Sequence, residues 1–274
     1  MIRVALIIAA SLYAAAVSAA DRVVALAPHL AELSCAVGGC AKLVGVANYT
    51  DYPAGLEKLP HIGDAFTVNT EALIGLKPDL VLVWDGGTPP ETAERLVALG
   101  LHVEPIKVNK LADVATALER VGQLLGTADA GKAAAAAYRQ RLAALTARYR
   151  GVKTLRVMYQ IEANPAFTIN QQSPISEVIT LCGGVNVFAD LSQLAAPVTK
   201  ESVLAANPDV VIYGEQDMGE EIRHYWAAFP QSKVQKQHNL YSVNASLLGR
   251  YSQRMLDGAE QMCAALQTAR SKQQ

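Results

Sequence analysis

The sequence contains two copies of one pattern, and this internal repeat limits the folds that the chain can adopt. Residues 69–84 read NTEALIGLKPDLVLVW and residues 199–214 read TKESVLAANPDVVIYG. In each copy a glutamate, Glu71 or Glu201, precedes Pro-Asp by seven residues, and an unbroken apolar run follows, so the copies lie 130 residues apart. A helix that begins near the glutamate and stops before the proline, followed by a strand buried on both faces, explains the pattern.

A second correspondence lies upstream of each copy. Glu32 precedes the paired glycines at Gly38 by six residues, and Glu177 precedes the paired glycines at Gly183 by the same number. Paired glycines end a helix, because glycine adopts the left-handed conformation without a Cβ clash. Each half therefore predicts strand, helix, glycine stop, strand, helix, Pro-Asp and strand. We predict an α/β fold of two pseudo-symmetric lobes with mainly parallel sheets.

One long helix is predicted between the two halves. Residues 129–151 contain many Ala, Leu and Arg and no Pro, which favours a continuous helix ending near a glycine. We therefore assign 21–128 to the N-terminal lobe and 152–270 to the C-terminal lobe. A proline-containing loop follows each predicted opening strand (22–26 and 154–160), and such loops at the carboxyl ends of parallel strands bind ligands. We expect a ligand cleft between lobes whose rigid connection permits only modest hinge motion.

Residues 1–20 have the features of a secretory signal peptide. An arginine near the start is followed by an apolar stretch and then by small residues, so that cleavage after Ala19 or Ala20 fits. The alternative is an uncleaved membrane helix, against which the shortness of the segment argues. No cysteine directly follows the apolar stretch, which argues against a lipid anchor. We expect the mature protein in the periplasm.

The four cysteines suit this oxidising compartment. They allow three pairings, and their spacing favours Cys35 with Cys40 and Cys182 with Cys263. None belongs to a CxxC pair, so a zinc or redox site is the weaker interpretation. We therefore predict two structural disulfides.

Charge and motifs narrow the class of function. Charged residues make up 18% of the chain and the net charge is −1, so nucleic acid and anionic lipid are not expected partners. No nucleophile elbow, phosphate loop or dinucleotide fingerprint is present, which argues against an enzyme. The five histidines are scattered, so no resident metal or other cofactor is expected. His29, in the predicted loop after the first strand, is a candidate ligand contact, and an unliganded loop histidine is the alternative.

Six segments carry a resemblance to a known family. They are VGVANYTDYP (44–53), NTEALIGLKPDLVLVWDGG (69–87), NPAFT (164–168), LCGGVNVFAD (181–190), TKESVLAANPD (199–209) and GRYSQR (249–254). In order and spacing they resemble the helical-backbone (cluster A) solute-binding proteins of ABC importers, and in particular their periplasmic cobalamin receptors. The resemblance covers the chain from Arg22 to about Gln267 and implies two α/β lobes joined by a single long helix.

The resemblance also implies a ligand site. Aromatic side chains would hold a corrin edge-in within the cleft, since aromatic walls supply contact area at low entropic cost. This role falls to Tyr49, Phe66, Trp84 and Phe167, with the loop from Ser246 to Arg250 closing the site. Each aromatic has a structural alternative, and Trp84 in particular ends an apolar strand and fits a core position.

Two departures from the family pattern bear on the ligand. Leu194-Ala195-Ala196 stands where the cobalamin receptor has a tryptophan, and Ser246, Leu247 and Leu248 replace acidic and aromatic residues. The resulting apolar rim makes cobinamide or another corrinoid an alternative to cobalamin. A receptor for haem or a ferric siderophore, with His29 or Tyr49 as iron ligand, is the further alternative, and an exported enzyme is the alternative of another class.

The resemblance finally assigns a docking role to the repeated glutamates. Glu71 and Glu201, one per lobe, would form salt bridges with arginines of the importer's membrane permease. The resemblance thus implies the permease as a partner and, through it, the importer's ATPase. Two equivalent carboxylates suit a two-fold importer dimer. The structural alternative is stabilisation of a helix N-terminus by negative charge. We expect a monomeric receptor that captures its ligand and delivers it.

Overall fold

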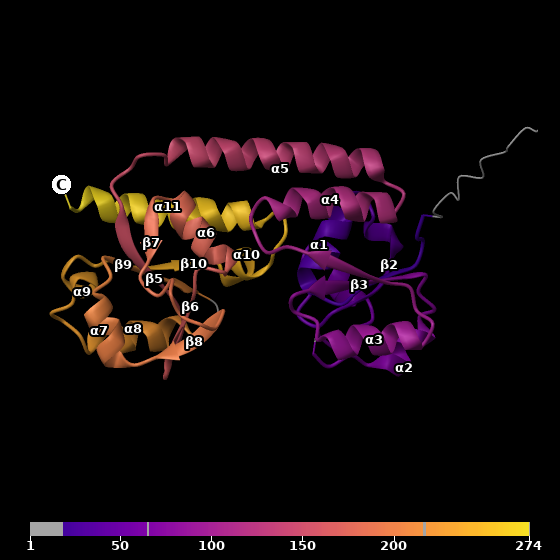
Figure 1. Cartoon of the computed structure of the whole chain (residues 1–274), viewed down its shortest axis with the longest axis horizontal. Helices are drawn as coiled ribbons and strands as arrows, with labels where there is room; N and C mark the ends of the chain where they lie inside the picture. Colours follow the sequence, from indigo (N-terminus) through magenta and orange to yellow (C-terminus); the bar gives the residue numbers. More distant parts are fainter. Residues whose placement is uncertain (1–18, 65, 216–217, 274) are drawn as a thin grey trace, which may run out of the picture.

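A computed structural model of the chain describes residues 19–64, 66–215 and 218–273. Two lobes lie side by side, and a single long helix runs above both of them (Figure 1). The predicted signal peptide lies outside the described residues except for Ala19 and Ala20. Within the described ranges, no helix combines the length and the apolar character needed to cross a membrane.

The N-terminal lobe is built on a four-stranded parallel sheet with the order β2-β1-β3-β4. Its strands are β1 (Val23–Ala25), β2 (Leu43–Val46), β3 (Leu80–Asp85) and β4 (Val103–Lys107). Its helices are α1 (Pro28–Ala36), α2 (Thr70–Gly75), α3 (Pro90–Ala98) and α4 (Asp113–Leu124), with short 3-10 turns η1 (Cys40–Lys42) and η2 (Leu56–Lys58).

The C-terminal lobe has a mixed sheet with the order β10-β9-β5-β6-β8, and β7 also pairs with β5. Its strands are β5 (Leu155–Ala163), β6 (Ala166–Ile169), β7 (Gly184–Asn186), β8 (Ala195–Val198), β9 (Val210–Gly214) and β10 (Leu240–Val243). Its helices are α6 (Pro174–Leu181), α7 (Lys200–Ala206), α8 (Gly219–Ala227), α9 (Lys233–Lys236), α10 (Ala245–Gly249) and α11 (Met255–Ser271). Among these named strands, β6 pairs antiparallel with β5 and with β8, and the other pairings are parallel.

The internal repeat is confirmed at the level of structure. Helix α7 begins 130 residues after α2, and β9 begins 130 residues after β3. The side chains of Asn69 and Thr199 cap the two helices by accepting hydrogen bonds from backbone N–H groups in the first turn. The predicted glycine stops also form, since Gly38 (φ 82°) and Gly183 (φ 74°) adopt the left-handed conformation just after α1 and α6.

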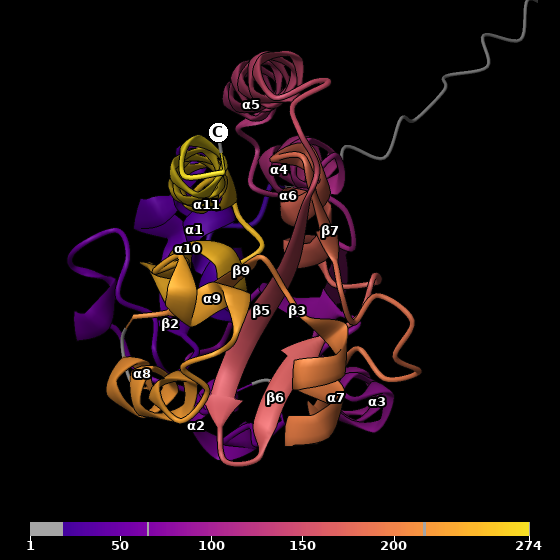
Figure 2. The ribbon, with the colours of Figure 1, turned by 90° about the vertical axis from the view of Figure 1, so that its left-hand side faces the viewer.

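The linking helix α5 runs over Ala128–Arg148, slightly shorter than the predicted 129–151, and Gly151 (φ 73°) follows in the turn before β5. Figures 1 and 2 show α5 lying over α4 and α11, on the outer side of both lobes. Arg141 of α5 contacts the side chains of Asp257 (2.6 Å) and Glu260 (2.9 Å) on α11. The connection between the lobes is therefore helical, and ion pairs fix its C-terminal half to α11.

One buried apolar cluster extends from the N-terminal lobe into the C-terminal lobe. It includes Leu30 of α1, Leu118 of α4, Val157 of β5 and Leu266 of α11. Both predicted disulfides form: Cys35 pairs with Cys40, and Cys182 pairs with Cys263, which ties the end of α6 to α11. A shared core of this kind restricts how far the lobes can move apart.

Candidate functional site

A cavity of about 470 Å³ lies where the two lobes meet. The N-terminal lobe contributes residues that follow β1 and β2, two residues of the segment before α2, and Trp84 near the end of β3. The C-terminal lobe contributes α10 and the residue after it. The lining residues are Leu26, Ala27, Pro28, His29, Ala47, Asn48, Tyr49, Asp64, Phe66, Trp84, Ala245, Ser246, Gly249 and Arg250. The cavity thus lies at the carboxyl ends of parallel strands, as the sequence predicts.

Two of the predicted aromatic residues line this cavity and are largely exposed to solvent. The side chain of Tyr49 is 80% exposed and that of Phe66 is 70% exposed. Asp64 fixes the loop of Phe66, because its Oδ1 accepts hydrogen bonds from the backbone N–H of Phe66 (2.9 Å) and of Thr67 (2.7 Å). Large aromatic surfaces held open to water in a concave site are typical of ligand contact.

Trp84 lies deeper and is half-buried at the end of β3. Its ring packs edge-on against His29, with 5.3 Å between centroids, and against Tyr251, with 5.6 Å. Tyr251 comes from the segment between α10 and α11, so residues of both lobes hold the indole. Sequence reasoning missed Tyr251, although it lies within the GRYSQR segment. Trp84 therefore combines a place in the cavity wall with the packed position that was its structural alternative.

His29 does not lie in a loop, as the sequence suggested, but in the first turn of α1. Pro28 starts the helix because its fixed φ suits the first helical position. The imidazole is only 4% exposed, and its Nε2 has no hydrogen-bond partner among the described residues. Burial, with a smaller contribution from the positive charge of Arg250, lowers the pKa of His29 to about 3. The site therefore contains a neutral imidazole.

The segment that was expected to close the site as a loop is the short helix α10. Ser246 and Arg250 line the cavity, but Leu247 and Leu248 are buried, so the expectation of an apolar rim is wrong at these two positions. The helix presents Ser246 to the cavity and turns Leu247 and Leu248 to the side that packs into the protein. The guanidinium of Arg250 forms ion pairs with Glu32 and Asp51 and donates a hydrogen bond to the carbonyl of Tyr49.

Phe167 lies outside the set of residues that line the cavity. It was expected in a loop after the opening strand, but Asn164 and Pro165 form a tight turn and Phe167 belongs to the antiparallel strand β6. Its side chain is half-buried. Figure 1 shows β6 and β8 on the flank of the C-terminal lobe nearer the N-terminal lobe. Leu194, just before β8, is exposed.

Glu71 and Glu201 are exposed and lie away from the cavity, in the first turns of α2 and α7. Both helices lie on the side of the molecule opposite α5 (Figures 1 and 2). A backbone N–H and the Thr199 hydroxyl lower the pKa of Glu201. In the described part of the chain, no three or more His, Cys, Asp or Glu side chains are arranged to hold a metal ion.

Two α/β lobes, a helical connection and an aromatic cavity at their junction define a two-lobed solute-binding protein. The chain belongs to the periplasmic binding protein family, whose model matches residues 23–237.

Relatives of known name support this membership. The chain is 34% identical to a vitamin B12-binding protein of Vibrio cholerae over 254 residues, which covers 92% of this chain and 91% of the relative. It is 33% identical to the vitamin B12-binding protein of Yersinia pseudotuberculosis over 262 residues, covering 95% and 91%.

Solved structures agree with the observed fold. The crystal structure of the periplasmic vitamin B12 binding protein of Vibrio cholerae is similar with a TM-score of 0.85 and 34% identity, covering 92% of this chain and 98% of that one. A periplasmic haem-binding protein of Pseudomonas aeruginosa has the same fold, with a TM-score of 0.79 and 24% identity over 90% of this chain and 92% of that one.

Proposed function

We propose that the protein is a periplasmic receptor that captures cobalamin or a related corrinoid such as cobinamide and delivers it to an ABC importer. The observation that carries the proposal is the cavity between the lobes, with Tyr49, Phe66 and Trp84 on its wall, in a chain 34% identical to a vitamin B12-binding protein. Export would depend on the signal peptide at residues 1–20. The ligand is cargo, and no resident cofactor or catalytic step is needed.

The physical properties of the cavity suit a corrinoid. A corrin is a large, flat macrocycle with an amide-fringed rim, so it can cover aromatic faces while its edge amides find polar partners. Tyr49 and Phe66 expose such faces, and the polar side chains of Asn48, Asp64 and Ser246 stand beside them. Covering the two rings would remove apolar surface from water and favour binding.

Haem is the second candidate ligand, because the phenol of the exposed Tyr49 offers an oxygen to an iron centre. The imidazole of His29 is less accessible, since its Nε2 is enclosed. Titration with cobalamin, cobinamide and haemin distinguishes the candidates. We expect corrinoids to quench Trp84 fluorescence and to bind in calorimetry. Absence of corrinoid binding at micromolar concentration, together with haemin binding, would favour the second candidate.

Capture, as opposed to catalysis, has its own test. A receptor returns its ligand chemically unchanged, whereas an exported enzyme alters it. We expect cobalamin recovered after prolonged incubation to have its original mass and absorption spectrum. A new product that forms in proportion to protein concentration would contradict the proposal.

We further propose that α2 and α7 form the docking surface for the membrane permease, with the receptor acting as a monomer. Glu71 and Glu201 are equivalent by the repeat, and Ile74 and Leu204, one turn later on the same helices, are equivalent too and are 46% and 44% exposed. Each lobe thus presents a carboxylate beside an aliphatic side chain, which fits a partner with two equivalent basic and apolar sites.

A charge reversal tests this docking surface. Glu71→Lys together with Glu201→Lys should leave cobalamin affinity intact and abolish uptake into vesicles that contain the importer, since each would place a cation against a basic site. The matched control is Glu91→Lys together with Glu220→Lys, which changes exposed glutamates at the second position of α3 and α8. Unimpaired uptake by the first pair, or equal loss in the control, would contradict the assignment.

A further inference from the structure

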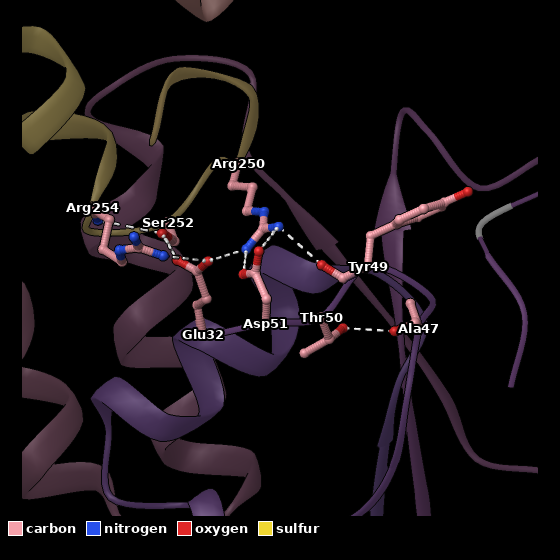
Figure 3. Close-up of polar contacts among 8 residues, drawn as sticks. All are labelled: Glu32, Ala47, Tyr49, Thr50, Asp51, Arg250, Ser252 and Arg254. Carbon is pink, nitrogen blue, oxygen red and sulfur yellow. Dashed lines mark hydrogen bonds and ion pairs between the residues drawn. The ribbon is translucent and has the colours of Figure 1, made fainter. Parts of the chain in front are cut away.

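A buried carboxylate of the N-terminal lobe is held by three side chains of the C-terminal lobe (Figure 3). Glu32 of α1 has a side chain with 0% exposure, and it accepts hydrogen bonds from Nη1 of Arg250 (3.2 Å), Nη1 of Arg254 (3.1 Å) and the hydroxyl of Ser252. All three donors lie in the segment that leads into α11. A buried carboxylate is stable only with such partners, so this contact fixes the segment against α1.

The same cluster reaches the cavity wall. Nη2 of Arg250 donates to the backbone carbonyl of Tyr49 (2.9 Å) and to Oδ2 of Asp51 (3.0 Å), and its Nη1 contacts Oδ1 of Asp51. Behind the loop, the hydroxyl of Thr50 donates to the carbonyl of Ala47 (2.7 Å). Figure 3 shows the ring of Tyr49 pointing away from the cluster while its carbonyl oxygen faces Arg250.

Tyr49 needs such support. Its φ of 64° lies in the left-handed region, which is costly for a residue with a side chain and persists only where neighbours hold it. Its ring is 80% exposed and gains little from packing, so the restraint falls on the backbone. The planar fork of an arginine can hold a carbonyl and two carboxylates at once. The aromatic wall of one lobe is therefore held by a guanidinium of the other.

The repeat supplies a second contact for comparison. Glu177 of α6 corresponds to Glu32 of α1, and its Oε2 accepts a hydrogen bond from the backbone N–H of Leu111 (2.6 Å), just before α4 of the opposite lobe. Each carboxylate thus joins the first helix of its own lobe to the segment before the last helix of the other. The two contacts differ in their donors, since Glu32 binds three side chains and Glu177 binds a backbone N–H. The contact of Glu32 also continues, through Arg250, to the loop of a cavity-lining side chain, Tyr49.

From this difference we propose that Glu32 is a positioning residue for ligand capture: it orients Arg250, which in turn holds the loop that carries Tyr49. The aromatic wall is then preformed only while the lobes keep their relative arrangement, so affinity is coupled to lobe geometry. The inference deepens the proposed corrinoid-binding function and rests on it.

Glu32→Gln removes the charge and keeps the shape, and Glu177→Gln is its matched control in the other lobe. We expect Glu32→Gln to raise the Kd for cobalamin roughly tenfold in calorimetry, a typical coupling for residues in contact, and Glu177→Gln to leave the Kd within about twofold. An unchanged Kd for Glu32→Gln, or an equal rise for Glu177→Gln, would overturn the proposal.

A double-mutant cycle separates positioning from general damage. If Glu32 acts through Tyr49, then in a Tyr49→Ala background the substitution Glu32→Gln should weaken cobalamin binding no further. Additive losses would contradict the proposal, because they would show that Glu32 affects binding without Tyr49. Should Glu32→Gln fail to fold, Arg250→Lys replaces it in the cycle, since lysine keeps the charge but lacks the planar fork.

Amide hydrogen exchange tests the positioning without any ligand. We expect segment 47–52 to exchange faster in Glu32→Gln than in the wild type, and to be unchanged in Glu177→Gln. Equal exchange in all three proteins would overturn the positioning role even if cobalamin binds. Wild-type protein that fails to bind cobalamin would instead contradict the proposed function, so the two failures are distinguishable.

Discussion

Burial of His29 makes the stability of the protein depend on pH. Its pKa falls from 6.5 to about 3 on folding, so between these values the unfolded chain binds more protons than the folded one. The free energy of unfolding should therefore be highest above about pH 6.5 and fall as pH is lowered, by at most about 1.4 kcal/mol per pH unit from this group. His29→Asn should flatten this fall, as measured by urea unfolding across the range.

The matched substitution is His102→Asn, which changes an exposed histidine before β4 and should keep the wild-type profile. An equally steep fall in His29→Asn would mean that other groups dominate the acid response. Asp51 contributes in the same direction, because its contact with Arg250 lowers the pKa of its carboxyl, but solvent screens this partly exposed pair.

A second residue whose substitution should change stability has a buried hydroxyl without a hydrogen-bond partner. Tyr138 of α5 is almost fully buried, and its hydroxyl has no hydrogen-bond partner among the residues described. An unpaired buried polar group opposes folding, so Tyr138→Phe should raise the free energy of unfolding by about 1 kcal/mol. Urea unfolding at neutral pH measures the change.

Tyr213 of β9 provides the comparison. It is as buried as Tyr138, but its hydroxyl accepts a hydrogen bond from Nη1 of Arg223 (2.9 Å). Tyr213→Phe should therefore lower the free energy of unfolding by about 1 kcal/mol, since it removes this hydrogen bond. A change of the same sign in Tyr138→Phe and Tyr213→Phe would contradict the predicted opposite effects on the free energy of unfolding.

At the scale of elements, the two disulfides should contribute unequally to stability. Cys182 and Cys263 are 81 residues apart and join α6 to α11, whereas Cys35 and Cys40 are 5 residues apart. Because the entropy removed from the unfolded chain grows with loop length, the double substitution by alanine should cost about 4 kcal/mol for the first pair and about 2 kcal/mol for the second. Urea unfolding of both variants tests the order, and the reverse order would contradict it.

Elements with clear end signals could be predicted from the sequence. The Pro-Asp pairs and paired glycines fixed the ends of α1, α2, α6 and α7, because these residues act through local backbone geometry. Strand β6 and helix α10 could not be predicted in this way. Both are short, and their conformations depend on pairing and packing with distant segments, so Phe167 and the pair Leu247 and Leu248 were assigned to the wrong surroundings.

The candidate site was predictable only in part. Tyr49, Phe66, Trp84, Ser246, Arg250 and His29 come together around one cavity. Their selection rested largely on the resemblance. The partnership of Glu32 with Arg250 joins residues 218 positions apart, and no local pattern encodes a contact at that separation. The sequence identified Glu32 as a residue of the internal repeat but gave no indication that it contacts Arg250.

At the scale of the whole molecule, the shared core, α5 and the contacts of Glu32 and Glu177 all oppose large rotations of one lobe against the other. A receptor built in this way spends little binding energy on rearrangement. We therefore expect α2 and α7, one on each lobe, to keep nearly the same separation when the cavity fills.

A constant separation of α2 and α7 would affect how empty and filled receptors compete for the proposed importer. If empty and filled receptors present the same two glutamates, the permease cannot sort them by shape, and the empty form acts as a competitive inhibitor. At a fixed amount of cobalamin, uptake into importer vesicles should rise with added receptor, pass through a maximum near equivalence and then decline. When cobalamin is instead kept in excess over the receptor, so that every receptor is filled, added receptor should cause no such decline. A plateau in place of the decline would mean that the importer does distinguish the two forms.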